Sequence, residues 1–159
     1  MLKSRLVFVL LTMLVAFSVQ SAFSMIRTLP LHDLVQQSEV IAIAMVEKIS
    51  DQGMDKDGIS NVKNVLLLSK LLKGTWDVKE PIVVMTKQAG KPGKIGWLED
   101  QIQFPPKGKQ VILFLKKAPD GSLQTVNLLQ GVWPLDGEKP LGMGFGFTMD
   151  QLKQEIEKK

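Results

Sequence analysis

The chain has 159 residues, no cysteine, 45% apolar residues and a formal net charge of +4. Without cysteine it can form no disulfide, so the core must be stabilised by packed side chains. Leaving out Lys3 and Arg5 in the N-terminal segment gives 18 basic against 16 acidic residues, a net charge of +2. Nucleic-acid-binding domains usually concentrate more positive charge, and the chain has no tyrosine for base stacking. We therefore expect no nucleic-acid partner.

Residues 1–24 have the pattern of a secretory signal peptide. Lys3 and Arg5 precede an apolar run over 6–19, and small residues at Ala22 and Ser24 suit a signal peptidase. An uncleaved membrane anchor is the alternative, but the apolar run is shorter than the roughly 20 residues of a spanning helix. We expect cleavage after Ser24, a secreted or periplasmic location and no membrane span afterwards. Residues 25–159 have the usual length of a single domain.

A short helix and a strand are predicted next. Leu31, Leu34 and Val35 are spaced for one buried helix face, and Pro30 suits the first helical turn. The apolar run over 39–49 has larger residues on one face and small ones on the other. This pattern predicts a strand that packs closely against another element.

The acidic segment 51–58 is interpreted as a solvated hairpin loop, because Asp and Gly are ordinary turn residues. A calcium-binding loop is the alternative. In that register Gly53 and Asn64 stand where the loop requires acidic ligands, so the hairpin is favoured.

Residues 61–74 are compatible with two structures. As a strand, one face would carry Val62, Leu66, Leu68 and Leu72; a helix would gather Val62, Val65, Leu66 and Leu72 instead. Periodicity alone favours neither. The Pro-led strand predicted at 81–86 favours an antiparallel pair.

A long, polar, glycine-rich loop is predicted over 87–104. Loops of this length in a compact domain are usually functional or disordered. We expect Lys87, Lys91, Lys94 and Trp97 to form a ligand-binding site in which the tryptophan is the anchor. The alternative is that Trp97 folds back onto the core with its apolar neighbours.

A hairpin is predicted from 104 onward. Its first strand, 110–116, should be buried on both faces, and after a turn at 119–121 its second strand should occupy 123–129. Residues 131–137 are expected to be a further turn. Near the C-terminus, Thr148 and Gln151 predict a capping box for an amphipathic helix in which Glu155 is solvent-exposed.

Three segments carry a resemblance to known proteins: LHDLVQQSEVI at 31–41, LKG at 72–74 and PKGKQVILFL at 106–115. In their order they resemble small secreted bacterial proteins with an OB-fold barrel of the tissue-inhibitor-of-metalloproteinases (netrin-module) type. The resemblance implies a mainly β fold, a small antiparallel OB-like β-barrel with a short N-terminal helix and a C-terminal amphipathic helix. Those inhibitors act through an N-terminal cysteine, which this chain lacks, so the resemblance implies no activity.

The sequence shows no catalytic constellation, and we predict no enzyme activity, no cofactor and no metal. His32 is the only histidine and has no recognisable nucleophile near it, while the acidic pairs Glu99–Asp100 and Glu155/Glu157 fit solvated surfaces. We expect a non-catalytic binding module that recognises a protein or small ligand through the 87–104 loop and the hairpin tips. The alternative is a self-assembling envelope or matrix accessory protein that acts through an exposed strand edge.

Overall fold

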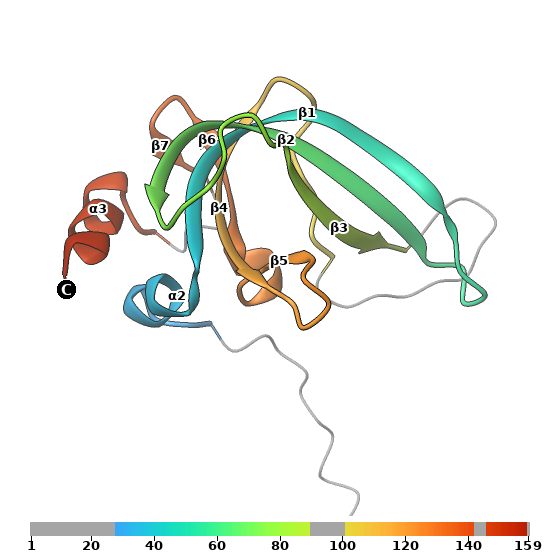
Figure 1. The fold of residues 1–159 in the computed structure, drawn as a ribbon, viewed down its shortest axis with the longest axis horizontal. Coiled ribbons are helices and arrows are strands. Elements are labelled where there is room, and N and C mark those ends of the chain that lie inside the picture. The colour runs from blue at the N-terminus through green and yellow to red at the C-terminus, as the bar shows by residue number, and fades with distance from the viewer. Residues whose placement is uncertain (1–27, 90–100, 142–145, 159) are drawn as a thin grey trace, which may run out of the picture.

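The fold is mainly β, with two short helices (Figure 1). The computed structural model describes residues 28–89, 101–141 and 146–158; the predicted signal peptide lies outside them. In chain order the elements are helix α2 (Leu31–Gln37), strands β1 (Val40–Met54), β2 (Ser60–Lys73), β3 (Ile82–Gln88), β4 (Gln110–Lys117) and β5 (Leu123–Thr125), a 3-10 turn η1 (Leu128–Gly131), strands β6 (Val132–Asp136) and β7 (Lys139–Pro140), and helix α3 (Met149–Glu157).

Five of the strands close into a barrel. They follow the order β1-β2-β3-β5-β4, and β4 pairs again with β1. The pairs are antiparallel except β3–β5, which is parallel where Val84 meets Leu123. A closed five-stranded barrel of this connectivity is compatible with an OB-like fold. The predicted fold class is therefore confirmed, with one parallel contact that the antiparallel prediction did not include.

The apolar core has two parts, one inside the barrel and one between the barrel and the helices. Strands β1 and β4 supply both, because successive side chains of a strand point to opposite faces. Ala42, Ala44 and Leu113 point into the barrel, whereas Ile41 and Phe114 point toward the helices. The sequence prediction for these two strands is thus confirmed, including the burial of β4 on both faces.

Both helices pack on the outer side of the barrel, α2 against β4 and α3 against α2 and β2 (Figure 1). The predicted capping box of α3 is present: Thr148 Oγ1 accepts from the Gln151 amide at 3.2 Å, and Gln151 Oε1 accepts from the Thr148 amide at 2.8 Å. Glu155, which we expected to be exposed, is only 12% exposed. It differs because its carboxylate lies between His32 of α2 and Lys158.

The segment 61–74 is a strand as far as Lys73: residues 61–73 belong to β2, which pairs antiparallel with β1 and β3. The pairing with β1 shifts at four places, and two of these shifts leave Ser69 and Leu72 without a direct partner. Such bulges reverse the side-chain alternation. Leu68 and Leu71 consequently pack against the barrel core, while Leu72 packs on the helix side. The predicted single face containing Leu72 was wrong for this reason.

Two predictions for the C-terminal half of the chain, over 123–129 and 131–137, were wrong. The strand expected over 123–129 ends at Thr125, because Asn127 and Leu128 adopt left-handed backbone conformations that turn the chain into η1. The turn expected over 131–137 contains strand β6, whose Pro134 lies opposite Val111 of β4. Proline gives a strand no amide donor, but its carbonyl still accepts, here from the Leu141 amide at 2.8 Å.

Candidate binding face

The hairpin of β1 and β2 reaches well beyond the rest of the barrel (Figure 1). Strand β1 pairs with β4 only from Val40 to Met45, whereas its pairing with β2 continues to Met54. Strand β3 follows β2 along the same stretch, from Leu66–Ile82 to Ser60–Gln88. Together the three strands form a sheet with one side toward the barrel interior and the other directed outward.

We call this second side the outer face. The burial of β2 shows which residues belong to this face. Val62, Asn64 and Leu66 are buried, so the residues between them must point to the outer face. The strand pairing then places on it Met45, Lys48 and Ser50 of β1, Asn61, Lys63, Val65 and Leu67 of β2, and Val83, Met85 and Lys87 of β3.

Half of the outer face is apolar. Met45 lies opposite Leu67, and Val65 lies opposite Val83. Leu67 is 42% exposed and Met85 50% exposed, and the other three side chains are half-buried. Single exposed apolar residues are common, but a contiguous group marks an interaction surface.

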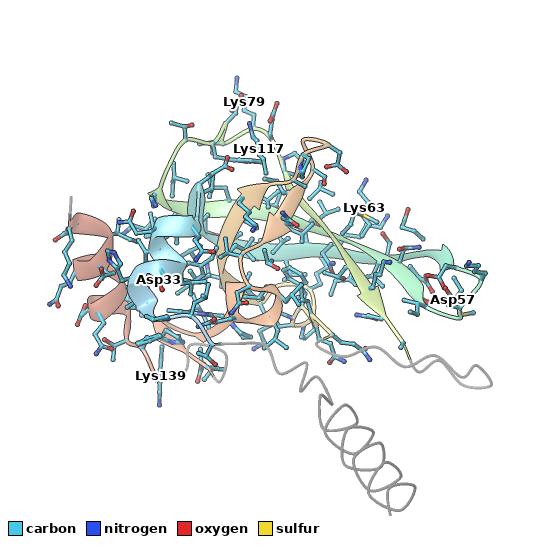
Figure 2. The ribbon with its side chains drawn as sticks, turned by 90° about the horizontal axis from the view of Figure 1, so that it is seen from below. Asp33, Asp57, Lys63, Lys79, Lys117 and Lys139 are labelled. Atoms are coloured by element: carbon cyan, nitrogen blue, oxygen red, sulfur yellow. The ribbon has the colours of Figure 1, made fainter. Side chains whose placement is uncertain are left out.

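The other half carries positive charge. Lys48, Lys63 and Lys87 are the charged residues among these members, none of which is Asp or Glu, and beyond Leu67 the next outward residue of β2 is the exposed Lys70, opposite Ile43. Within the part of the chain that the structure describes, none of the three takes part in an ion pair. Figure 2 shows Lys63 pointing away from the strands into solvent.

One carboxylate lies at the rim of the outer face. Glu47 is the extra residue of the β1 bulge, and its Oε1 accepts from Lys107 Nζ at 2.8 Å. Beside this ion pair is an open hollow of about 430 Å³ lined by Glu47, Lys48, Ile49, Val65 and Lys107. The hollow joins the outer face at Lys48 and Val65, so a partner of the face can also enter it.

Buried hydrogen bonds hold the sheet under the outer face. The Asn64 Nδ2 atom donates to the Val84 carbonyl at 3.1 Å and to Thr86 Oγ1 at 2.9 Å. Both residues are on β3, so this buried amide ties the two strands together. Because a buried polar group is costly without partners, the contacts favour one register. The positions of Lys63, Met85 and Lys87 on the outer face are fixed by that register.

The structure brings one of the four predicted site residues to this face. Lys87 lies opposite Asn61 at the end of β3 and is exposed. Lys91, Lys94 and Trp97 lie outside the described residues. The last part of the predicted loop is anchored: Gln101 Oε1 accepts from the Ala89 amide at 3.3 Å, and Phe104 is buried in the barrel.

A second candidate is an open groove of about 560 Å³ at one end of the barrel, which the sequence analysis missed. Trp76 lies in it on the β2–β3 connection and packs partly against the barrel core. Two polar groups that line the groove form hydrogen bonds within the protein. Trp76 Nε1 donates to the Glu80 carbonyl at 2.9 Å, and Glu39 Oε1 accepts from the Lys117 amide at 3.1 Å. The groove therefore has a structural explanation, and we favour the outer face.

The acidic turn between β1 and β2 is a hairpin loop, but it is shorter than the predicted 51–58 because β1 continues to Met54. Asp55 Oδ1 accepts from the amides of Asp57 and Ile59, both at 3.0 Å, so the carboxylate closes the turn. Over 28–89, 101–141 and 146–158 the structure contains no group of three or more His, Cys, Asp or Glu side chains arranged for a metal ion. In the same ranges no helix has the length and apolar character to cross a membrane.

His32 contacts another helix at the surface. Its side chain is 62% exposed, and Nδ1 lies 2.8 Å from Glu155 Oε1. Hydrogen bonds from Lys158 and from His32 lower the pKa of Glu155 below its ordinary value. The arrangement links α2 to α3.

Comparison of the chain with protein-family models gave no match, and comparison with curated proteins gave none either.

Proposed function

We propose that the protein is an exported, non-catalytic binding module that holds a protein or small ligand on the outer face of β1–β3. The observation that carries the proposal is the exposed apolar group centred on Leu67 and Met85, set on the same sheet beside three lysines that form no ion pair with the described residues. Covering such a group removes apolar surface from water, which stabilises a complex by about 25 cal/mol per Å² before the costs of association.

The type of fold also favours the outer face as the binding site. OB-type barrels frequently bind ligands along their second and third strands and the adjoining loops, which is an argument by analogy. In this chain that region is β2, β3 and the segment that begins at Lys87. Export is proposed on the N-terminal pattern of residues 1–24, and kinship with netrin-module barrels on the three segments that resemble them.

The test is capture of a partner with the wild-type protein and with a Leu67→Thr, Met85→Thr double variant. Threonine keeps strand propensity while removing the apolar contact. The matched control is Val78→Thr, since Val78 is 74% exposed on the β2–β3 connection, outside the outer face. We expect one partner with the wild type and the control and none with the double variant. Equal capture by all three proteins would place the binding site elsewhere.

Self-assembly is the second candidate function, and one observation favours it. From Lys48 to Met54, strand β1 pairs with β2 on one side and with no strand on the other among the described residues. An unpaired edge can accept a strand from a second copy. Sedimentation at rising concentration tests this, with Gln52→Pro as the variant, because proline removes an edge amide. A concentration-dependent oligomer that Gln52→Pro abolishes supports assembly; a monomer at every concentration excludes it.

A further inference from the structure

We propose that His32, Glu155 and Lys158 form a proton-controlled latch between α2 and α3, which is tightest in mildly acidic solution and looser in neutral and in strongly acidic solution. The latch is a conformational device on the helix side of the barrel. It goes beyond the proposed function and does not depend on what the outer face binds.

The centre of the latch is the Glu155 carboxylate, which has a partner on each oxygen. His32 Nδ1 of α2 lies 2.8 Å from Oε1, and Lys158 Nζ donates to Oε2 at 2.8 Å. The Glu155 side chain is only 12% exposed, whereas that of His32 is 62% exposed. The carboxylate is therefore largely covered, while the histidine ring is open to water and can gain or lose a proton without any movement of the core.

The latch acts on the second half of α3. The first half is held by the capping box and by the buried Met149 and Leu152. In the second half the apolar contact comes from Ile156, which is only half-buried. A helix of nine residues is not stable alone in water, so its last turn depends on contacts with its neighbours. The bond between Glu155 and His32 joins that last turn to α2.

The charges that act on the Glu155 carboxylate are those of Lys158 and His32, in that order of strength, and both lower its pKa. Strand β2, which also contacts α3, contributes Lys73, whose Nζ donates to the Val35 carbonyl at 2.6 Å. Strands β4 and β6 contribute apolar side chains to this side of the barrel. The two helices carry four other charged residues: Asp33, Asp150, Lys153 and Glu157.

Two titrations set the pH range of the latch. Histidine gains a proton below about pH 6.5, and a protonated ring forms a stronger, charge-assisted contact with a carboxylate. This contribution is present below that pH and is lost as the pH rises through it. Because the pKa of Glu155 is lowered, the contribution of its carboxylate is present above the ordinary value of 4.5 and is lost as the pH falls below it. Both charges are therefore present together between about pH 4.5 and 6.5.

The experiment is a double-mutant cycle on the full-length protein with His32→Asn and Glu155→Gln. Asparagine keeps a neutral donor in the place of Nδ1, and glutamine keeps the shape of the side chain without its charge. A cycle is used because a protonated histidine in the first turn of α2 is unfavourable by itself, and this cost cancels in the coupling. Urea unfolding near pH 3, 5.5 and 8 gives the folding equilibrium constants, and ¹³Cα chemical shifts report the helix in 149–152 and in 153–157.

We expect His32 and Glu155 to be coupled by about two- to fivefold in the folding equilibrium constant near pH 5.5, the range of a surface ion pair. Near pH 3 and pH 8 the coupling should almost vanish. The helical ¹³Cα shifts of 153–157 should decrease at both extremes, while those of 149–152 stay constant. Lys153→Gln is the matched control, because its ion-pair partner is Asp150 at 3.8 Å, and it should leave the pH profile unchanged.

Three outcomes would overturn the inference: a coupling of the same size at all three pH values, no coupling near pH 5.5, or a loss of helix that is confined to 149–152. The first would mean that the contact is static, and the second that the two side chains do not support each other. The proposed function is tested separately, because the capture experiment changes Leu67 and Met85 and leaves both helices intact.

Discussion

Lys63 and Met85 lie directly opposite each other on β2 and β3, on the side of the sheet that points away from the barrel interior. A lysine and a half-exposed methionine in this position combine positive charge with apolar surface. Neither side chain contributes to the barrel core. The core is built from residues of these strands that point to the other side of the sheet, such as Leu66 and Val84. The pair therefore marks the place where the apolar and basic parts of the outer face meet.

Because the outer face is exposed, changing it should leave stability almost intact. We expect Leu67→Thr and Met85→Thr each to change the free energy of unfolding by no more than about 0.5 kcal/mol, as for surface sites in general. Urea denaturation followed by circular dichroism measures this. A loss of several kcal/mol would show that these side chains support the fold, and the capture experiment would then need milder substitutions.

Trp133 should be the most sensitive position of the helix-side core. It is fully buried, its ring centroid lies 4.6 Å from that of Phe114, and Nε1 donates to the Gln130 carbonyl at 2.8 Å. Trp133→Ala should lower the free energy of unfolding by about 3–5 kcal/mol. Trp133→Phe keeps most of the apolar volume but loses the hydrogen bond, so urea denaturation should show a smaller loss, with about 1 kcal/mol from that bond.

Gly74 should not tolerate a side chain. Its φ angle is +85°, and a Cβ atom would meet the carbonyl oxygen of Glu39, the residue before β1. Gly121 has a similar φ of +82° but open space around it. We expect Gly121→Ala to lose about 1–2 kcal/mol from the left-handed backbone alone, and Gly74→Ala to lose clearly more. Equal melting temperatures for the two variants would contradict the close contact with Glu39.

The link between α2 and α3 should weaken in acid. The pKa of Glu155 is lowered in the folded protein by hydrogen bonds from Lys158 and His32, against an ordinary value of 4.5. A lowered folded-state pKa contributes stability above the unfolded pKa and loses it as pH falls toward the folded pKa. The stability difference between wild type and Glu155→Gln should therefore shrink as pH is lowered below about 4.5. A difference that stays constant from pH 6 to pH 3 would mean that the carboxylate charge contributes nothing.

The strands β1 and β4 could be predicted because each contains an uninterrupted apolar run, 40–46 and 111–115. In β2 the same reasoning was ambiguous, since two bulges, at Ser69 and Leu72, change which side chains share a face. Strand β6 was taken for a turn because Pro134 and its flanking glycines are turn residues by composition. Pairing with β4 outweighs that local preference, and pairing is not visible in a single sequence.

The candidate site was only partly predictable. Lys87 was identified from the basic composition of the segment that it begins, and it belongs to the outer face. Leu67 and Met85 were missed because apolar residues in a strand are normally assigned to the core. The available signal was the neighbouring lysine: Lys63 lies two residues from Val65 on the same face of β2, as Lys87 does from Met85 on β3. Cross-strand neighbours became known only from the structure.

The most direct test of the central claim is amide hydrogen exchange of the full-length protein with and without its captured partner. We predict slower exchange in 61–67 and 82–88 when the partner is bound, and unchanged exchange in α3, on another side of the barrel. Protection confined to the groove around Trp76 or to the helices, with β2 and β3 unchanged, would contradict the assignment of the outer face as the binding site.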